Sequence, residues 1–178
     1  EPSATTRHIT ELTMLDIEMA FVSSHQEVMD TVANMTKHAL RRAYDEHADD
    51  LKSLNAPELK LTDAVPAFTI AEIHEMYKKA TKNNTTEEKD LIPDEERWIA
   101  DYARKELGSD LVYATAFPKE AGKFYHKFKD DGTVAWGDLL FRGLEIATVP
   151  LRENNYEKMI EQMKDAGLDI DHPGYKYY

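Results

Sequence analysis

The sequence predicts an α+β fold in which an antiparallel sheet is flanked by helices. Apolar and polar residues alternate over 9–22 and again beyond residue 110, whereas apolar residues recur at helical spacing in between. Strands on both sides of a helical block, without regular strand–helix alternation, favour an antiparallel sheet over a parallel one. The length of 178 residues suits one domain. We therefore expect 1–178 to be part of a single domain with a helical insertion over about 51–108.

The first strand and the first helix are expected before residue 51. A polar, Thr-rich loop over 1–7 leads into the strand over 9–22, which has one apolar face and one face that carries Asp16 and Glu18. A Ser-x-x-Glu capping box at 24–27 then starts a helix that we expect to reach about residue 50.

Two shorter helices are expected in the insertion. Residues 51–68, which include two prolines, predict a connector with a short extended piece. A second capping box at 69–72 opens a helix to about Thr81, and a polar loop follows over 83–89. Pro93 suits the first position of a helix, and acidic residues in its first turn match the helix dipole. This helix is expected to end at Gly108.

The last third of the chain returns to strands. We expect strands over 111–117, 123–127 and 135–149, the last two joined by the Asp131-Gly132 dipeptide, which is typical of hairpin turns. A helix over 153–166 is expected to end at Gly167, and residues 168–178 resemble a loop.

Composition and missing motifs exclude several functions. Lys and Arg number 22 and Asp and Glu 34, so the net charge of −12 disfavours broad contact with a nucleic-acid backbone. The absence of cysteine excludes disulfides and thiol catalysis and is consistent with a reducing, cytoplasmic location. No apolar run approaches the ~20 residues of a membrane helix, so no membrane partner is expected. The glycine-rich phosphate loops, the H-E-x-x-H zinc motif and the G-x-S-x-G elbow are also missing.

Two segments carry information about function. Residues 1–21 read EPSATTRHITELTMLDIEMAF, a polar loop that runs into an acidic strand, and residues 136–152 read WGDLLFRGLEIATVPLR. Taken alone, Asp16 and Glu18 are typical of a solvated strand face, and Arg152 beside Glu153 is typical of a surface pair. Only the joint occurrence of the two segments favours a catalytic interpretation.

The first segment resembles the second signature motif of class II aminoacyl-tRNA synthetases, in its aspartyl and asparaginyl version. Eight residues match that motif in order and spacing: Glu1, Arg7, His8, Glu11, Asp16, Glu18, Met19 and Ala20. The second segment is similar to the family's strand F-D-L-x-x-R-G-x-E-I-x-[ST]-G-[GA]-Q-R. Between them, Phe117-Pro118-Lys119 and Phe124-Tyr125 resemble the family's Y-P-x-x-x-R-P-F-Y stretch. The chain therefore resembles an internal piece of such a catalytic domain, truncated at both ends.

The resemblance implies a role for each matching residue. It implies ATP and Mg²⁺ as substrate and cofactor, an aspartate or asparagine substrate, tRNA for that amino acid as partner, and a homodimer. The implied ATP-binding residues are Glu1 at the adenine end, Arg7 and His8 at the phosphates, Ile9 and Glu145. Glu145 would also hold the Mg²⁺ ion, with Asp138 and Thr148 beside it. Thr148 and Arg152 would bind the amino acid, with Arg152 at its side-chain carboxylate or amide.

The chemistry suits these residue types. The attacking carboxylate is already ionised near neutral pH, so no residue is assigned as a general acid or base. The work is to position the carboxylate and ATP and to neutralise charge as pyrophosphate leaves. Carboxylates suit Mg²⁺, and the planar guanidinium of Arg152 can make two hydrogen bonds to a carboxylate.

The second segment departs from the family pattern at Val149-Pro150-Leu151, where the family has Gly-Gly or Gly-Ala before Gln. Glycine permits close approach of a ligand, whereas Val and Pro do not. This departure leaves open a paralogue that makes an amidated amino acid without tRNA, or a non-catalytic binding module. We expect the isolated chain to form no adenylate.

The spacing of two predicted metal ligands raises a separate difficulty. Asp138 and Glu145 are seven residues apart, so they share a face only if the strand is irregular, and we expect a bulge at Gly143.

Overall fold

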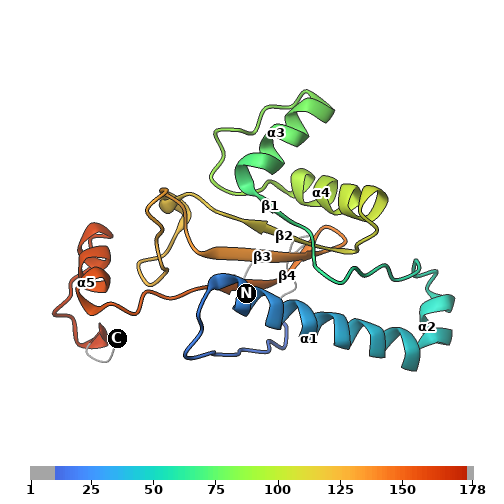
Figure 1. Ribbon diagram of the computed structural model, residues 1–178, viewed down its shortest axis with the longest axis horizontal. Helices are drawn as coiled ribbons and strands as arrows, with labels where there is room; N and C mark the ends of the chain where they lie inside the picture. The colour runs from blue at the N-terminus through green and yellow to red at the C-terminus, as the bar shows by residue number, and fades with distance from the viewer. Residues whose placement is uncertain (1–10, 176–178) are drawn as a thin grey trace.

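The computed structural model describes residues 11–175, which form a mixed sheet with helices on both faces (Figure 1). Its four strands lie in the order β1-β2-β3-β4; β1 runs parallel to β2, and the other two pairs are antiparallel. The elements are α1 (His25–Glu46), α2 (Ala48–Ser53), β1 (Ala67–Thr69), α3 (Ile70–Thr81), α4 (Pro93–Glu106), β2 (Leu111–Thr115), the 3₁₀ turn η1 (Lys119–Ala121), β3 (Trp136–Phe141), β4 (Leu144–Pro150), α5 (Tyr156–Asp165) and η2 (Pro173–Tyr175). The α+β class is confirmed, with one parallel pair in addition to the predicted antiparallel ones.

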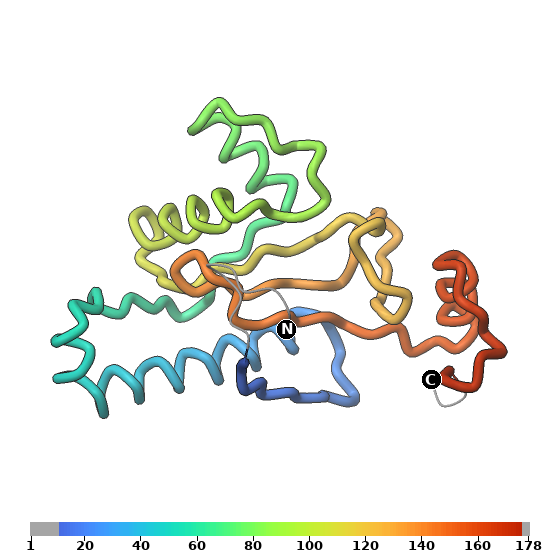
Figure 2. The backbone as a smooth tube through the Cα atoms, turned by 180° about the vertical axis from the view of Figure 1, so that it is seen from behind, coloured from blue at the N-terminus to red at the C-terminus, as the bar shows by residue number. Residues whose placement is uncertain are grey.

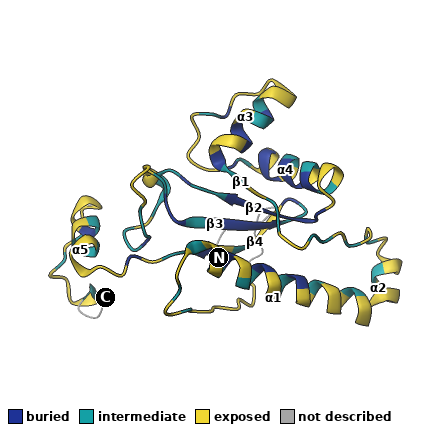
Figure 3. Ribbon diagram, viewed as in Figure 1, coloured by how far each residue is buried: buried dark blue, intermediate teal, exposed yellow. Residues whose placement is uncertain are grey.

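The sheet separates two apolar layers. On one face, Ile73 of α3 and Ile99 of α4 pack with Val112, Ala114 and Leu140. On the other face, the buried residues of α1 pack against the alternate positions of the strands: Met29, Ala33, Leu111, Tyr113, Leu139 and Val149. Figure 3 shows this burial concentrated in β2, β3 and the inner sides of the helices. Helix α5 lies beyond the end of the sheet (Figure 2).

The predicted helices form close to their expected bounds. Thr69 and Glu72 make the reciprocal capping box that opens α3. At α1, Ser24 accepts from the backbone N–H of Glu27, but the Glu27 carboxylate accepts from Ser23 instead of Ser24. The predicted helix to residue 50 is interrupted at His47, so that α1 and α2 are separate helices.

Three strand predictions are wrong. In the described part of the first predicted strand, 11–22, the backbone forms no strand, and Met14, Leu15 and Phe21 are exposed. An alternating pattern becomes a strand only where a neighbouring strand supplies the hydrogen-bond ladder, and none of the described strands pairs with this segment. Residues 123–127 make only an isolated bridge, between His126 and Arg152.

The third wrong strand, 135–149, is a hairpin of β3 and β4. Its two-residue turn consists of Arg142 and Gly143, both with positive φ (51° and 83°), as a type I′ turn requires. The Asp131-Gly132 dipeptide also forms a tight turn, but it is flanked by the single bridge between Phe128 and Val134.

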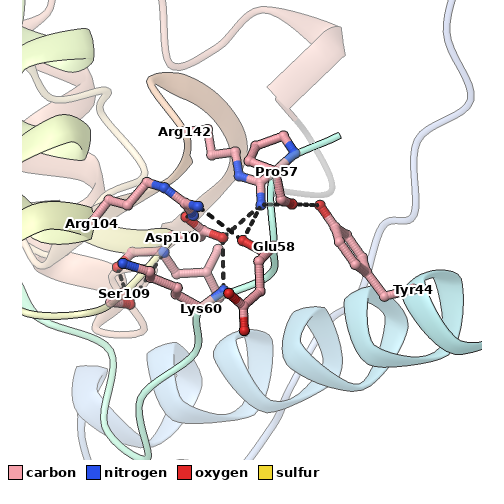
Figure 4. Close-up of polar contacts among 9 residues, drawn as sticks. Tyr44, Pro57, Glu58, Lys60, Arg104, Ser109, Asp110 and Arg142 are labelled. Carbon is pink, nitrogen blue, oxygen red and sulfur yellow. Dashed lines mark hydrogen bonds and ion pairs between the residues drawn. The ribbon is translucent and has the colours of Figure 1, made fainter. Parts of the chain in front are cut away.

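A buried carboxylate holds the Arg142 turn and the connector before β1 together (Figure 4). Asp110 accepts from Arg104, from Arg142 Nη2 (2.8 Å) and from the backbone N–H of Lys60 (2.9 Å). Arg142 also donates to the carbonyls of Pro57 and Glu58. Burial of Asp110 opposes its ionisation, but the hydrogen bonds from the two guanidinium groups hold its pKa below the ordinary value. The positive φ of a non-glycine residue is thus stabilised by tertiary contacts.

Candidate functional site

A β-bulge places three predicted site residues on one face of the sheet. Asp138 pairs with Thr148 and Leu140 pairs with Glu145, so Ile146 is an extra residue in β4. Directly opposed residues of antiparallel strands point to the same face, and Asp138 and Leu140 share a face because they are two apart. Asp138, Glu145 and Thr148 therefore all lie on the face covered by α3 and α4.

The predicted irregularity exists, but at Ile146 and not at Gly143, which forms the hairpin turn. Without the bulge, Glu145 and Thr148 would point to opposite faces, because they are three residues apart. With it, the Thr148 hydroxyl donates to Glu145 Oε1 at 2.8 Å. We call Asp138, Glu145 and Thr148 the acidic cluster.

Asp138 is the buried member of the acidic cluster, with 6% of its surface exposed. The indole N–H of Trp136 donates to its Oδ1 at 2.7 Å, and Trp136 in turn stacks on Phe117. The pKa of Asp138 is raised to about 7, mainly by burial and then by the negative charge of Glu145, whereas the hydrogen bond from Trp136 and the nearby Thr148 hydroxyl oppose the rise. Asp138 is thus a buried acidic group beside the exposed carboxylate of Glu145, where a cation would offset both negative charges.

The donor set of the cluster fits Mg²⁺. All three side chains offer oxygen, the ligand that this hard cation prefers, and Mg²⁺ is commonly held through one or two carboxylates plus substrate phosphates. Among residues 11–175 no group of three or more His, Cys, Asp or Glu side chains could hold a metal by itself. The cluster is therefore a partial ligand set that other oxygens would have to complete.

Arg152 joins the two informative segments of the sequence. Its Nη2 donates to Glu18 Oε1 at 2.7 Å, and its guanidinium carbon lies 5.5 Å from the centre of the Tyr125 ring. Glu18 belongs to the first segment and Arg152 to the second, so residues 134 positions apart in the sequence meet here. Glu1, Arg7, His8 and Ile9 lie outside the described residues, so their approach to Glu145 stays a prediction.

The departure at 149–151 affects the two faces of β4 differently. The Val149 side chain is buried in the layer with α1, away from the acidic cluster, and the ring of His25 donates to its carbonyl at 2.7 Å. Pro150 pairs with Trp136 and lies on the same face as Thr148. Val149 therefore leaves the space over the cluster open, and Pro150 is the substitution that faces it.

Sequence reasoning did not find the roles of two residues near the site, the half-buried Trp136 and the buried His126. No sequence pattern reveals that Trp136 donates to Asp138, apart from its position two residues before Asp138. His126 is 4% exposed, and its pKa is lowered to about 4 by burial and by the positive charges of Lys123 and Arg152. Its Nδ1 accepts from the Lys123 backbone N–H at 3.2 Å, as suits a neutral imidazole. A lone histidine after an aromatic pair gives no pattern that would reveal this.

Comparison with known proteins decides the family. The family model described as tRNA synthetases class II (D, K and N) matches residues 1–178. This chain belongs to that family. Among the curated class II relatives, an aspartate–tRNA(Asp/Asn) ligase of Aeropyrum pernix is 34% identical over 176 residues, which are 96% of this chain and 39% of that protein. The corresponding ligase of Thermus thermophilus is 31% identical over 169 residues, 95% of this chain and 40% of that protein.

Solved class II synthetases share the fold. The aspartyl-tRNA synthetase of Entamoeba histolytica superposes with a TM-score of 0.83 at 23% identity, covering 94% of this chain and 36% of that one. The asparaginyl-tRNA synthetase of the same organism, in complex with asparaginyl-adenylate, has a TM-score of 0.71 at 22% identity, covering 85% of this chain and 34% of that one. The chain spans about 40% of the length of the relatives it matches. No helix within 11–175 is long and apolar enough to cross a membrane.

Proposed function

We propose that this chain is the central part of the catalytic domain of an aspartate–tRNA or asparagine–tRNA ligase, which activates its amino acid with ATP and Mg²⁺ and then loads tRNA. The observation that carries the proposal is the acidic cluster: the bulge at Ile146 sets two carboxylates and a hydroxyl on one face. Family membership supports the reaction class. The whole protein is proposed to work as a homodimer in the cytoplasm.

Each side chain then has a positioning or charge-balancing task. Glu145, Thr148 and Asp138 would hold Mg²⁺, which supplies positive charge to the triphosphate as pyrophosphate leaves. Glu1 would contact the adenine, Arg7 and His8 the phosphates, and Ile9 would line the same site. These groups act by orienting ATP for in-line attack by the ionised amino-acid carboxylate.

Arg152 is proposed to select the amino acid. Its guanidinium donates to Glu18 and lies over the Tyr125 ring, at the point where the two informative segments meet. A planar guanidinium can donate two hydrogen bonds to a carboxylate but fewer to an amide oxygen. Arg152 therefore favours aspartate where both of its outer nitrogens face the substrate.

The test is amino-acid-dependent ATP–pyrophosphate exchange by the full-length protein, with aspartate and asparagine compared. We expect Glu145→Gln to lower kcat/KM by 10²-fold or more, since it removes a charge from the proposed metal site. Arg152→Ala should raise KM for the amino acid more than KM for ATP. Glu161→Gln, an exposed carboxylate on α5, is the matched control. Full activity of Glu145→Gln, or no exchange by the wild-type protein with either amino acid, would reject the proposal.

A further inference from the structure

Helix α5 lies beyond the end of the sheet (Figure 1), but its Gln162 side chain reaches back to residues 123–127, which we call the bridge segment. The side-chain nitrogen of Gln162 donates to the carbonyls of Phe124 and His126, to the latter at 3.0 Å. A backbone carbonyl can only accept a hydrogen bond, so the NH₂ end of the amide faces the bridge segment. Its two N–H groups allow one side chain to satisfy both carbonyls.

The bridge segment also holds the backbone at Arg152. The N–H of Lys127 donates to the carbonyl of the residue before Arg152 at 2.8 Å. The N–H of the residue after Arg152 donates to the carbonyl of Tyr125 at 2.9 Å. These two hydrogen bonds flank the bridge that pairs Arg152 with His126. The position of the Arg152 backbone therefore depends on the position of the bridge segment.

This pairing has little support from the sheet. Two backbone hydrogen bonds form a weak pair, because even a complete two-stranded hairpin is marginally stable in water. None of the four strands within 11–175 includes the bridge segment. At one end of the segment, the N–H of Ala135 donates to the carbonyl of Lys127 at 2.9 Å. At the other end, near Phe124, it is Gln162 that donates, so the helix supplies support where the sheet gives none.

Helix α5 is tied to Arg152 on its other side by the chain itself. Residues 153–155 connect the two, and Glu153 in this connector is buried and accepts from the N–H of Asn155 at 2.9 Å. The Asn155 side chain then caps the first turn of α5. Gln162 thus closes a loop of contacts that runs from Arg152 through α5 and the bridge segment back to Arg152.

The side chain of Arg152 depends on the same loop of contacts. Its guanidinium carbon lies 5.5 Å from the centre of the Tyr125 ring. Tyr125 stands between the two residues whose carbonyls accept from Gln162. A shift of the bridge segment would therefore move both the backbone of Arg152 and the aromatic ring beside its guanidinium.

We propose that Gln162 is a positioning residue for Arg152: it fixes the bridge segment, and with it the Arg152 backbone and the Tyr125 ring. This inference rests on the proposed function, in which Arg152 binds the amino acid. Gln162 acts through Arg152 and not through ATP, so its loss weakens binding of the amino acid and leaves binding of ATP nearly unchanged.

The first experiment needs no substrate. Hydrogen–deuterium exchange of the full-length protein is followed by mass spectrometry over 123–128 and 151–155. Gln162→Met keeps the side-chain length and removes the donor, Gln162→Lys keeps a donor, and Glu161→Met is an exposed control on the same helix. We expect deuterium uptake over both segments to be about tenfold faster in Gln162→Met, and changed by less than about twofold in the other two variants.

Two results of this experiment would overturn the proposal. Unchanged uptake over 123–128 in Gln162→Met would show that the amide is not needed to hold the bridge segment. An equal rise over β2 and α1 would show a loss of global stability in place of a local one. Uptake in Gln162→Lys close to that of the wild type would instead support the donor role, because only the ability to donate is restored.

The second experiment measures ATP–pyrophosphate exchange by the full-length protein. In Gln162→Met, KM for the amino acid should rise about fivefold and KM for ATP by less than about twofold, and Gln162→Lys should restore KM for the amino acid. In an Arg152→Ala background, Gln162→Met should change KM for the amino acid by less than about twofold, because the two residues act as one unit.

The contrary results separate this inference from the proposed function. An equal rise in KM for both substrates, or full additivity of Gln162→Met with Arg152→Ala, would overturn the positioning role while the wild type remains active. No pyrophosphate exchange by the wild type with either aspartate or asparagine would reject the proposed function itself. Deuterium uptake then still decides whether Gln162 holds the bridge segment and the Arg152 backbone.

Discussion

Replacing Asp138 by Asn should stabilise the chain at pH 8 and leave its stability at pH 4 nearly unchanged. Asn keeps the Oδ1 acceptor for the Trp136 indole and removes only the charge. In the folded chain the pKa of Asp138 is raised from 3.8 to about 7. A carboxyl with a raised folded pKa contributes its full stability below the unfolded value, and this contribution is lost as the pH rises through the folded one.

The size of the effect follows from the interval between the two pKa values. At about 1.36 kcal/mol per pKa unit, the rise from 3.8 to about 7 corresponds to roughly 4 kcal/mol of lost stability above pH 7. Asp138→Asn should recover much of that loss at pH 8, less whatever Asn loses in packing. At pH 4 both chains carry a neutral group at this position and should agree to within about 1 kcal/mol.

The assay is urea unfolding followed by circular dichroism at pH 4 and pH 8, with Asp130→Asn, an exposed carboxylate, as control. Adding Mg²⁺ at 100 times its Kd should stabilise the wild type at pH 8 by about 2.7 kcal/mol, and Asp138→Asn by less. This gain should shrink below pH 7, where protons compete for Asp138. A variant that is less stable than wild type at pH 8, or equally stabilised at both pH values, would refute the reasoning.

Three further outcomes are expected in urea unfolding. Asp110→Asn should destabilise the chain by about 3 kcal/mol at pH 7, because it weakens the pairing of this buried position with the partly buried guanidinium groups of Arg104 and Arg142. Gly143→Ala should cost about 1–2 kcal/mol, because φ is +83° there and the added Cβ would lie 3.0 Å from an Arg97 backbone atom. The pKa of His126 is lowered to about 4, so the folded chain resists protonation of this side chain. As the pH falls from 6.5 to 4, the wild type should therefore lose roughly 3 kcal/mol of folding stability relative to His126→Gln.

Each of these outcomes has a contrary result. Asp130→Asn is the control for Asp110→Asn, and equal stability of the two would show that the buried network is not needed. Gly132→Ala has a similar φ of +83° with open space around it, so it should cost less than Gly143→Ala; the reverse order would contradict the contact with Arg97. A difference between wild type and His126→Gln that does not change with pH would contradict a neutral, buried imidazole.

The sequence was sufficient for the helices because their start signals are local. The Thr69–Glu72 box and Pro93 mark the first turns of α3 and α4. The end of α1 was less predictable, since residues 43–50 contain no glycine or proline and His47 breaks the helix without a strong local cue. In this chain, local sequence thus predicts where a helix begins better than where it ends.

The strands were harder because their limits depend on tertiary contacts. Residues 135–149 give one apolar pattern, and the turn within it requires a positive φ at Arg142, which the ion pair with Asp110 helps to hold. The segment 11–22 has the alternation of a strand, but alternation does not supply a partner strand. The candidate site shows the same limit: the spacing of Asp138 and Glu145 predicted an irregular strand, yet which residue is extra depends on the register with β3.

The charges at this edge of the sheet depend on two buried groups, Asp138 and His126, whose pKa values are shifted in opposite directions. Trp136 donates to Asp138, and the centre of its ring lies 5.5 Å from the centre of the His126 ring. With pKa values of about 7 and about 4, both groups are uncharged in the interval between, so burial costs little there. Above pH 7 only Asp138 ionises, and the net change is one negative charge beside Glu145. In the proposed site a cation would compensate that charge and ATP phosphates would complete its ligand set, so the cost that burial imposes at pH 8 would be offset when Mg²⁺ binds.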